Sequence, residues 1–304
     1  MKSTHDMRGS CIRRPGGKGD LADKLVPLFP NAELYVEPFF GAGSIFYAIP
    51  DNTYPRMAIN DLDKQIVTFF RVLRTRTEEF IRVCELTPYS RDEFIAALEH
   101  SDDELEEARR VWIRSRQGFA GQATAAGNWG RSDQKTWNPG SAETKFKLFR
   151  EYAERLRVVA IDNVDAIEFI QKWTFEDTFI YCDPPYVTAS RKSEHYEHEM
   201  TDADHRRLAE VLHEAAKAGA KVGISGYPNE LYDSELYKGW RRVEFDVKFT
   251  GSQKKDDNPR RTEVFWMSYP ESAQRRYQPS RAPKATSKRE QGIAKALTRA
   301  GVVR

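Results

Sequence analysis

The residues best suited to chemistry are Asp183, Pro184, Pro185 and Tyr186, which follow the run TFIYC at 178–182. That run of apolar and β-favouring residues predicts a buried strand. The two prolines fix φ and donate no backbone hydrogen bond, so the strand must stop there and nearby carbonyls can face a ligand. An ionised Asp183 can only accept hydrogen bonds, and Tyr186 offers a flat face for stacking. These groups suit the exocyclic NH2 of a flipped nucleobase; the alternative is a turn with an N-cap aspartate.

Two other predicted strands end in residues that suit a cofactor. The strand at 33–38, ELYVEP, leads into the turn GAGS at Gly41–Ser44, where glycines let the backbone approach a ligand closely. The same glycines are also compatible with an ordinary turn. Asp61 closes the next strand, RMAIN, and lies 18 residues after Gly43. A carboxylate at about that distance commonly accepts hydrogen bonds from a ribose, although a helix N-cap is the alternative. The missing third glycine of the dinucleotide pattern favours an adenosine cofactor without a pyrophosphate.

An alternation of strands and helices would place these residues together. Strands are predicted at 33–38, 56–60, 157–162, 178–182 and 221–225, and helices at 21–29, 64–75, 166–172 and 203–219. This alternation predicts an α/β fold with a parallel sheet, in which ligands bind at the carboxyl ends of the strands. The last two strands, at 241–249 and 262–269, have no helix between them, which predicts an antiparallel hairpin at one edge.

A mostly helical region interrupts the alternation from about residue 77 to residue 156. It contains charged helical patterns and a long loop rich in Gly, Ser, Asn and Thr, which is typical of a functional or disordered segment. Arginine can read guanine edges and phosphates, and glutamine can read adenine, so the helix patterned RVWIRSRQGF is a candidate DNA-reading element. The alternative is a solvated helix face. The candidate DNA-binding residues are Arg110, Arg114, Arg116 and Gln117, with Lys254, Lys255, Arg260 and Arg261 in a polar loop before the last strand.

Charge is distributed unevenly along the chain. The formal net charge is +2 over 304 residues, but 271–304 holds nine Lys/Arg and two Asp/Glu, a local net of +7. A basic tail of this kind favours polyanions such as nucleic acid, with a merely solvated disordered end as the alternative.

Several classes of protein are not expected from the composition. No apolar run is long enough to cross a membrane, and the first 20 residues lack the apolar core of a secretory signal. The 3 cysteines show no CxxC spacing, which argues against disulfides and fits a reducing cytoplasm. His195, His198 and His205 have no Cys or carboxylate at an accepted ligand spacing, so no metal is expected, and His205 is expected on a helix surface.

At these motifs the sequence resembles the Dam-like, class D12 adenine-N6 DNA methyltransferases. The DPPY motif after an apolar strand is the most specific part, and VEPFFGAGS and IND resemble the family's cofactor loop and acidic strand end. PGGKGDLADKL resembles its N-terminal motif for S-adenosylmethionine, and the order of the motifs is that of the α group. The resemblance covers roughly 14–270. Arg14 stands where the family usually has an aromatic residue, and Ala166 where it often has Phe.

The resemblance implies a Rossmann-like S-adenosylmethionine-dependent methyltransferase sheet with an inserted target-recognition domain. The catalytic domain would comprise 14–76 and 157–270, the recognition insertion 77–156, and the basic tail 271–304. Asp183, Pro184, Pro185 and Tyr186 would be catalytic. The cofactor-binding residues would be Arg14, Lys18, Glu37, Phe39, Gly41, Gly43, Ser44, Asp61, Asp165 and Asp183.

In this family picture Asp61 holds the ribose, Lys18 lies near the cofactor's carboxylate, and Phe39 lies near its sulfonium. The transfer is direct, so Cys182 is expected to be a small core residue that faces away from Asp183. The substrate is double-stranded DNA, in the cytoplasm of a bacterium or of a phage-infected host. No metal is needed, and such enzymes often act as monomers.

Three alternatives remain open at this point. One is methylation of cytosine N4 or of adenine in RNA, although the cytosine enzymes usually carry Ser where Asp183 stands. A second is a catalytically silent nucleic-acid-binding protein on the same fold. A third is a nicotinamide-dependent oxidoreductase, which the missing third glycine and the DPPY motif disfavour. The recognised DNA sequence, a cognate restriction enzyme and the biological role are not encoded in any of these motifs.

Overall fold

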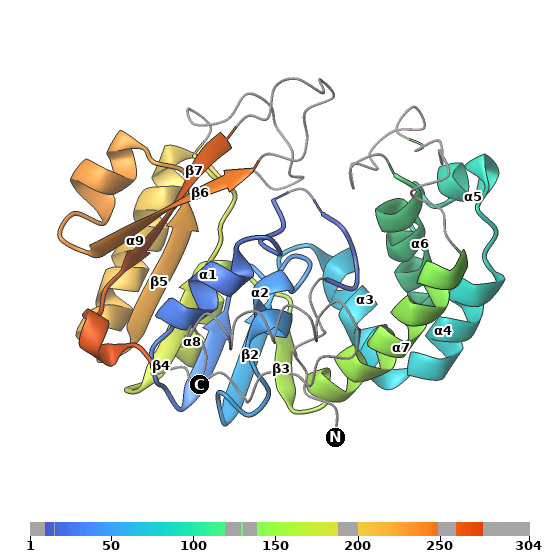
Figure 1. Ribbon diagram of the computed structural model, residues 1–304, viewed down its shortest axis with the longest axis horizontal. Coiled ribbons are helices and arrows are strands. Elements are labelled where there is room, and N and C mark those ends of the chain that lie inside the picture. Colours follow the sequence, from blue (N-terminus) through green and yellow to red (C-terminus); the bar gives the residue numbers. More distant parts are fainter. Residues whose placement is uncertain are drawn as a thin grey trace, which may run out of the picture.

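The protein is built on a seven-stranded sheet with the strand order β3-β2-β1-β4-β5-β7-β6 (Figure 1). The computed structural model describes residues 10–14, 16–118, 129, 139–187, 200–248 and 260–275. The strands are β1 (Leu34–Glu37), β2 (Arg56–Asn60), β3 (Val159–Asp162), β4 (Thr178–Cys182), β5 (Lys221–Gly226), β6 (Arg241–Lys248) and β7 (Arg260–Met267).

Five of the strands are parallel, and the chain order reverses in the middle of the sheet. β1 pairs with β2 on one side and with β4 on the other, so the carboxyl ends of β1 and β4 form a topological switch point. The last two strands form the predicted antiparallel hairpin, in which β7 lies beside β5 and β6 forms the edge. The predicted Rossmann-like α/β sheet is therefore confirmed.

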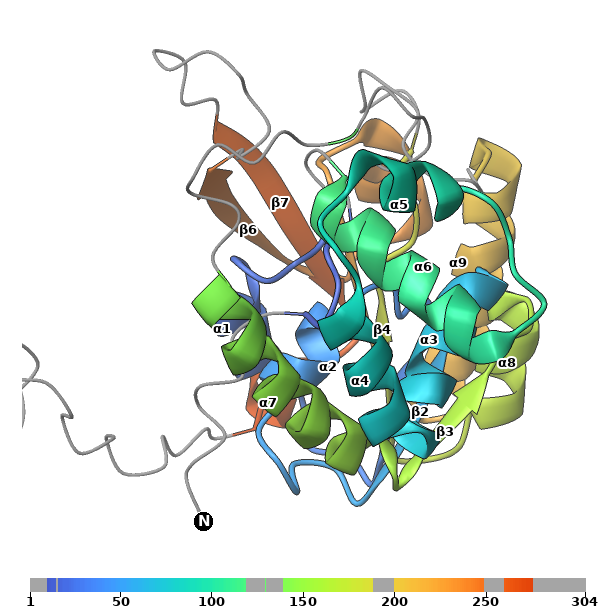
Figure 2. The ribbon, with the colours of Figure 1, turned by 90° about the vertical axis from the view of Figure 1, so that its right-hand side faces the viewer.

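The helices pack on both faces of the sheet and beyond the β3 edge (Figures 1 and 2). Pro27 stops the predicted helix at 21–29 early, and a short 3-10 turn continues from it. The helices are α1 (Ala22–Leu25), α2 (Ser44–Ala48), α3 (Lys64–Thr75), α4 (Thr77–Leu86), α5 (Arg91–Ala96), α6 (Glu104–Gln117), α7 (Pro139–Leu156), α8 (Ala166–Trp173) and α9 (Asp202–Lys217). Shorter turns are η2 (Val26–Leu28), a π-helical turn η5 (Leu231–Leu236) and η6 (Glu271–Ala273).

Alternation along the buried strands divides the core into two layers. Tyr35, Phe179 and Tyr181 face the layer that holds α1, α2 and α3. Val36 and Ile180 face the opposite layer with α8 and α9. Burying a side chain of this size contributes about 1.5–3 kcal/mol, so covering both faces of the parallel strands accounts for much of the stability of the sheet.

The helices α4, α5, α6 and α7 form a group that packs on α3 (Figure 2). Aromatic rings connect the group to the sheet layer. The ring centres of Phe69 in α3 and Phe80 in α4 are 5.4 Å apart, and those of Phe80 and Phe149 in α7 are 5.5 Å apart. The mostly helical character predicted for 77–156 is seen in the described residues, and α7 begins ahead of the predicted pattern at 145. The predicted domain boundaries remain predictions. Among the described residues, none of the helices could span a membrane.

Substituting Gly43 with alanine should destabilise the protein. Gly43 has φ +71°, and a Cβ there would lie 2.7 Å from the Cζ of Phe40, so Gly43→Ala should lower the free energy of unfolding by about 1–3 kcal/mol. Gly19→Ala is the matched control, because a Cβ at Gly19 meets no atom within 4 Å; it should change the stability by less than about 0.5 kcal/mol. Urea unfolding of both variants measures the difference, and equal stabilities would contradict the steric argument.

Candidate active site

A cavity of about 520 Å³ opens at the carboxyl ends of β1, β2 and β4. Its volume lies in the range of small-molecule sites. Every predicted cofactor residue except Gly43 lines it. Of the predicted catalytic residues, Asp183 and Pro185 reach the wall of the cavity, whereas Pro184 and Tyr186 are not part of the lining. The topology thus brings together side chains from β1, β2, β4 and the N-terminal loop.

The glycine turn and Asp61 are joined directly. Asp61 accepts a 2.7 Å hydrogen bond from the Gly41 amide and a 2.9 Å bond from the Asp63 amide. The N-cap of α3 is Asp63, whose side chain accepts from Gln65; the N-cap alternative for Asp61 is therefore wrong. Burial raises the pKa of Asp61, and the nearby Arg14 cation and the two amides act against that rise. Asp61 is thus held as an acceptor at the cavity wall.

Arg14 closes one side of this arrangement. Its Nη1 lies 2.8 Å from Asp63 Oδ2, so the N-terminal loop is tied to the loop after β2. Gly43 adopts φ +71° as the N-cap of α2, and Ser44 begins that helix. Asp165 caps α8 by accepting a 2.9 Å bond from Ile167, and it also lines the cavity. Asp165 therefore has the N-cap role in this structure whether or not it contacts a cofactor.

Asn60, the last residue of β2, was not singled out from the sequence. Its side-chain amide donates to the carbonyls of Pro38 and Val164 at 3.1 and 3.0 Å, and its oxygen accepts from the Val164 amide at 3.0 Å. One buried side chain therefore joins the loops that follow β1 and β3. The signal in the sequence was a polar residue directly after four residues of strand pattern.

Glu37 is a buried acid at the end of β1. Its Oε2 accepts a 2.8 Å hydrogen bond from the hydroxyl of Tyr35, two residues earlier on the same face of the strand. Burial raises the pKa of Glu37 well above its usual range, although the Tyr35 hydroxyl favours the ionised form. Phe39, half-buried, lines the same cavity. The β1 wall of the cavity therefore carries a carboxyl group whose pKa is raised.

Lys18 and Asp183 form a buried ion pair at the centre of the site. The Lys18 Nζ lies 3.0 Å from Asp183 Oδ1, with only 7% of the lysine side chain exposed. Lys18 also donates to the carbonyl of Gly16 at 3.1 Å. Burial raises the pKa of Asp183, whereas Lys18 and the hydroxyl of Tyr186 oppose that rise. The structure thus places Lys18 against the DPPY motif as well as in the cavity wall.

Tyr186 lies behind Asp183 and is nearly enclosed. Its hydroxyl is 2.8 Å from Glu263 Oε2 and 3.2 Å from Asp183 Oδ1. Lys18 Nζ lies 4.6 Å from the centre of its ring, and the ring of Tyr227 packs edge-on at 4.6 Å. Tyr227 and Glu263 were not singled out from the sequence. The signals were an aromatic directly after the strand GISG and a charged residue in an otherwise apolar strand.

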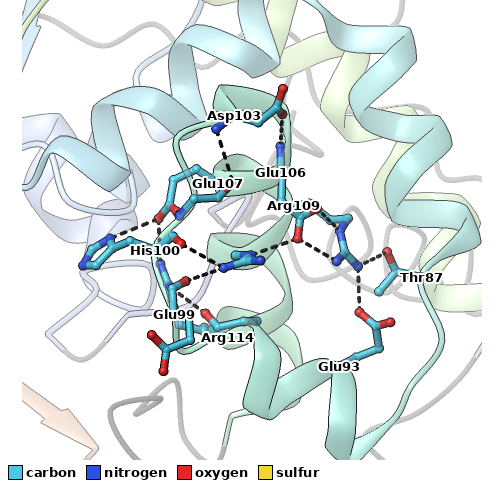
Figure 3. A network of polar contacts seen from close by, with 12 residues as sticks. Thr87, Glu93, Glu99, His100, Asp103, Glu106, Glu107, Arg109 and Arg114 are labelled. Atoms are coloured by element: carbon cyan, nitrogen blue, oxygen red, sulfur yellow. Dashed lines mark hydrogen bonds and ion pairs between the residues drawn. The ribbon is translucent and has the colours of Figure 1, made fainter.

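The predicted DNA-binding residues on α6 differ in their surroundings. Arg110 contacts Glu106 at 2.9 Å and the carbonyl of Glu99 at 2.9 Å. Arg114 is mostly buried and donates to the carbonyl of Ala97 at 2.7 Å. Both guanidinium groups are therefore held by the protein itself. Figure 3 shows Arg114 within the same network as Glu106 and Arg109.

Gln117 and Arg116 complete that end of α6. Gln117 is buried, donates to the carbonyl of Pro88 at 3.1 Å and accepts from Trp129 at 3.4 Å. Arg116 is half-buried and makes no hydrogen bond or ion pair within the described residues. Burial lowers the pKa of Arg116, and the nearby Arg13 cation lowers it further. Arg13 and Arg116 thus bring two positive charges close together.

The remaining basic candidates lie near β7. Arg261 donates to the hydroxyl of Tyr227 at 3.1 Å, and its guanidinium lies 5.6 Å from the centre of that ring. Arg260 is the first residue of β7, and its side chain lies outside the described residues. Lys254 and Lys255 also lie outside them.

The histidines do not form a metal site in the described part of the chain, where three or more potential ligands nowhere cluster. His195 and His198 lie outside that part. The prediction that His205 lies on a helix surface is wrong: it is fully buried, with Nδ1 2.9 Å from the hydroxyl of Tyr232. His205 occupies the first position of the buried stripe of α9 that continues through Leu208 and Leu212. Cys182 is fully buried in the layer of α8 and α9, as predicted.

Residues 15–250 match the family model of the D12 class N6 adenine-specific DNA methyltransferases. The chain belongs to this family. The DNA adenine methylase of Vibrio cholerae is 25% identical over 241 residues, covering 75% of this chain and 84% of that protein. The DNA adenine methylase of Escherichia coli K12 is 23% identical over 245 residues, covering 75% and 82%. A type II methyltransferase of Methanocaldococcus jannaschii is 23% identical over 259 residues, covering 75% and 88%.

A solved S-adenosylmethionine-dependent methyltransferase from Agrobacterium tumefaciens is a distant structural likeness. It has a TM-score of 0.34 and 12% identity, with 82% of this chain and 60% of that chain covered. Membership of the D12 family makes the protein a DNA adenine-N6 methyltransferase that uses S-adenosylmethionine. The chemistry of the cavity fits that cofactor: Asp61 is a fixed acceptor, Lys18 is a cation, and Ile45, Ile167 and Leu208 supply apolar wall.

The buried acids of this site should cost stability at neutral pH. A glutamate titrates at about pH 4.3 in an unfolded chain, and the pKa of Glu37 is raised by burial in the folded one. The protonated form is therefore favoured by the fold, and this stabilisation is complete below the unfolded pKa and is lost as pH rises through the folded pKa. At pH 8 the free energy of unfolding of Glu37→Gln should exceed that of the native protein by about 1 kcal/mol. This difference should vanish near pH 4.

Urea unfolding across this pH range measures the effect. Glu210→Gln, an exposed position on α9, is the control for loss of one negative charge. A Glu37→Gln variant whose stability runs parallel to that of the native protein at every pH would contradict the assignment of a strained buried acid.

Proposed function

We propose that the protein transfers a methyl group from S-adenosylmethionine to N6 of an adenine flipped out of duplex DNA, at a specific sequence. The observation that supports this most directly is the state of Asp183. Lys18 and Tyr186 both contact its Oδ1, at 3.0 and 3.2 Å, and its Oδ2 has no partner within the described residues. One carboxylate oxygen at the cavity wall is thus available for an amino group.

The cofactor would lie along the carboxyl ends of β1 and β2. Asp61, fixed by the amides of Gly41 and Asp63, would accept hydrogen bonds from the ribose hydroxyls. The close approach of the backbone at Gly41 would admit the methionine portion, and Phe39 would lie near the sulfonium. Glu37 lines the same side of the cavity, where the positive charge of a bound cofactor would act against the rise of its pKa and favour its ionised form.

The chain's own residues would orient the adenine rather than form a covalent bond with it. The bound cofactor supplies the electrophilic methyl group, and the protein supplies binding, orientation and electrostatics. Asp183 and the carbonyl of Pro184 would accept the two amino hydrogens, which draws the nitrogen lone pair out of conjugation. Burial raises the pKa of Asp183, and Lys18 beside it acts against that rise and so favours the charged form of the acceptor.

Tyr186 would stack on the flipped adenine, as the DPPY motif implies. In this structure Tyr186 is 9% exposed, and Lys18 lies over its ring. Lys18 would therefore have to shift from the ring when a base enters. Lys18 is also close enough to the cavity to meet the carboxylate of the cofactor.

DNA binding would use Arg116 more than its neighbours on α6. Arg110 and Arg114 are held by acids and carbonyls of the protein, so a contact with DNA would have to break those bonds first. Within the described residues, the side chains of Arg116 and Arg13 make no such contacts, and close positive charges attract phosphates. The expected monomeric state and the phosphate contacts of Lys254, Lys255 and Arg260 stay predictions.

Asp183→Ala should abolish methyl transfer, with a loss on the order of 10³-fold or more, because the amino group would lose its charged acceptor. S-adenosylmethionine should still bind within about tenfold of its native affinity, since the ribose contact at Asp61 is intact. Cys182→Ala, one residue earlier on the opposite face of β4, is the control and should keep its activity. Transfer of labelled methyl groups to duplex DNA gives the rates; near-native turnover of Asp183→Ala would overturn the proposed mechanism.

Arg116→Gln should weaken binding to duplex DNA. The slope of log K against log salt concentration should become shallower by about 1. Arg110→Gln is matched in chemistry and helix, but its side chain already contacts Glu106 and the Glu99 carbonyl. It should leave DNA affinity unchanged. Titrations of labelled DNA at several salt concentrations separate the two variants, and identical slopes for both would refute the preference for Arg116.

A further inference from the structure

Glu263 is a buried acid beside the site, and no motif considered above assigns it a role. It lies in β7 and pairs with Phe245 of β6, one residue before Val264 pairs with Gly226 at the end of β5. Because β7 runs antiparallel to β5, Glu263 lies at the carboxyl ends of the parallel strands, as the DPPY motif does. Only 7% of the residue is exposed, and the strand beyond it is apolar.

Glu263 shares the hydroxyl of Tyr186 with Asp183. The hydroxyl oxygen lies 2.8 Å from Glu263 Oε2 and 3.2 Å from Asp183 Oδ1. A tyrosine hydroxyl has one proton, so it can make one strong donated bond at a time. The shorter distance assigns that bond to Glu263.

The competition matters because Asp183 Oδ1 already accepts from Lys18 at 3.0 Å. If Glu263 did not hold the hydroxyl, the proton of Tyr186 would turn fully to Asp183. The carboxylate would then share its charge between Lys18, Tyr186 and the incoming amino group. The ring of Tyr186 would also lose the bond that fixes its far end.

Lys18 makes this pair of acids electrostatically tolerable. Burial raises the pKa of Glu263, and the Lys18 cation is the largest influence acting against that rise. The hydrogen bond from Tyr186 compensates part of the cost of burying the acid. Lys18 thus favours the ionised form of both carboxylates, and the hydroxyl of Tyr186 contacts both of them.

We propose that Glu263 is a positioning residue for methyl transfer: by accepting the hydroxyl proton of Tyr186, it fixes the Tyr186 ring and keeps Asp183 free for the adenine amino group. This inference rests on the roles proposed for Asp183 and Tyr186. Because Glu263 does not line the cavity, we expect it to affect the positioning of the adenine and not the binding of S-adenosylmethionine.

Two variants of Glu263 separate position from charge. Glu263→Gln loses the charge but keeps an acceptor oxygen at the same reach, whereas Glu263→Asp keeps the charge and withdraws it by one carbon. If Glu263 acts by position, the glutamine variant should stay within about threefold of the native single-turnover rate, and the aspartate variant should be slower by roughly 10–100-fold. Affinity for S-adenosylmethionine should remain within about twofold in both.

A second step tests whether the effect passes through the hydroxyl. In a Tyr186→Phe background the aspartate substitution should slow transfer by less than about threefold, because the bond it disturbs is already gone. Glu244→Asp, an exposed position on the adjacent strand of the same hairpin, is the control and should leave the rate unchanged.

The outcomes are distinct. A Glu263→Asp variant as fast as the native enzyme, a glutamine variant slower than the aspartate one, or a full aspartate effect in the Tyr186→Phe background would each overturn the role of Glu263. Asp183→Ala is measured alongside. If it too were active, the proposed function of the site would fail; if it is inactive, only the inference about Glu263 is at stake.

Discussion

The ion pair between Lys18 and Asp183 is the interaction on which the site depends. It joins the loop before α1 to the end of β4, two segments that are distant in the sequence, and both partners are largely buried. A buried pair of this kind contributes little net stability but is costly to break, because one charge would be left without a partner. Its value here is positional: it sets where Asp183, Tyr186 and the cavity wall lie relative to one another.

In the rest of the site, too, side chains connect loops that are distant in the sequence. Asn60 bonds to the loops after β1 and β3, Asp61 holds the glycine turn, and the pair of Arg14 and Asp63 closes the side. The contacts of Asn60 and Asp61 satisfy backbone groups that the ends of parallel strands would otherwise leave unpaired. The arrangement that satisfies the backbone is therefore also the one that gathers acids around a cavity. Burial raises the pKa values of Glu37 and Asp183, and a cationic cofactor bound beside them would act against that rise.

The helical group on α3 shows the limits of reading charge from a pattern. The arginines of α6 share a helix and a residue type, and only their neighbours distinguish them. Glu106 and the carbonyls of the preceding turn bind Arg110, whereas Arg116 lies at the end of the helix next to Arg13. Which arginine can meet DNA is therefore a question of partners rather than of sequence.

By itself the sequence determined the α/β class, the strand ends and the motif residues, because apolar periodicity, proline and glycine act locally and each leaves a pattern over a few residues. The strand order, the hairpin partner of β5 and the contacts of Glu263, Tyr227 and Asn60 were decided only by the tertiary structure. So was the burial of His205, which had been expected on the surface of its helix. The physical reason is that these features are set by pairings across long stretches of chain, where a residue's surroundings come from elements that its own neighbours in the sequence do not specify.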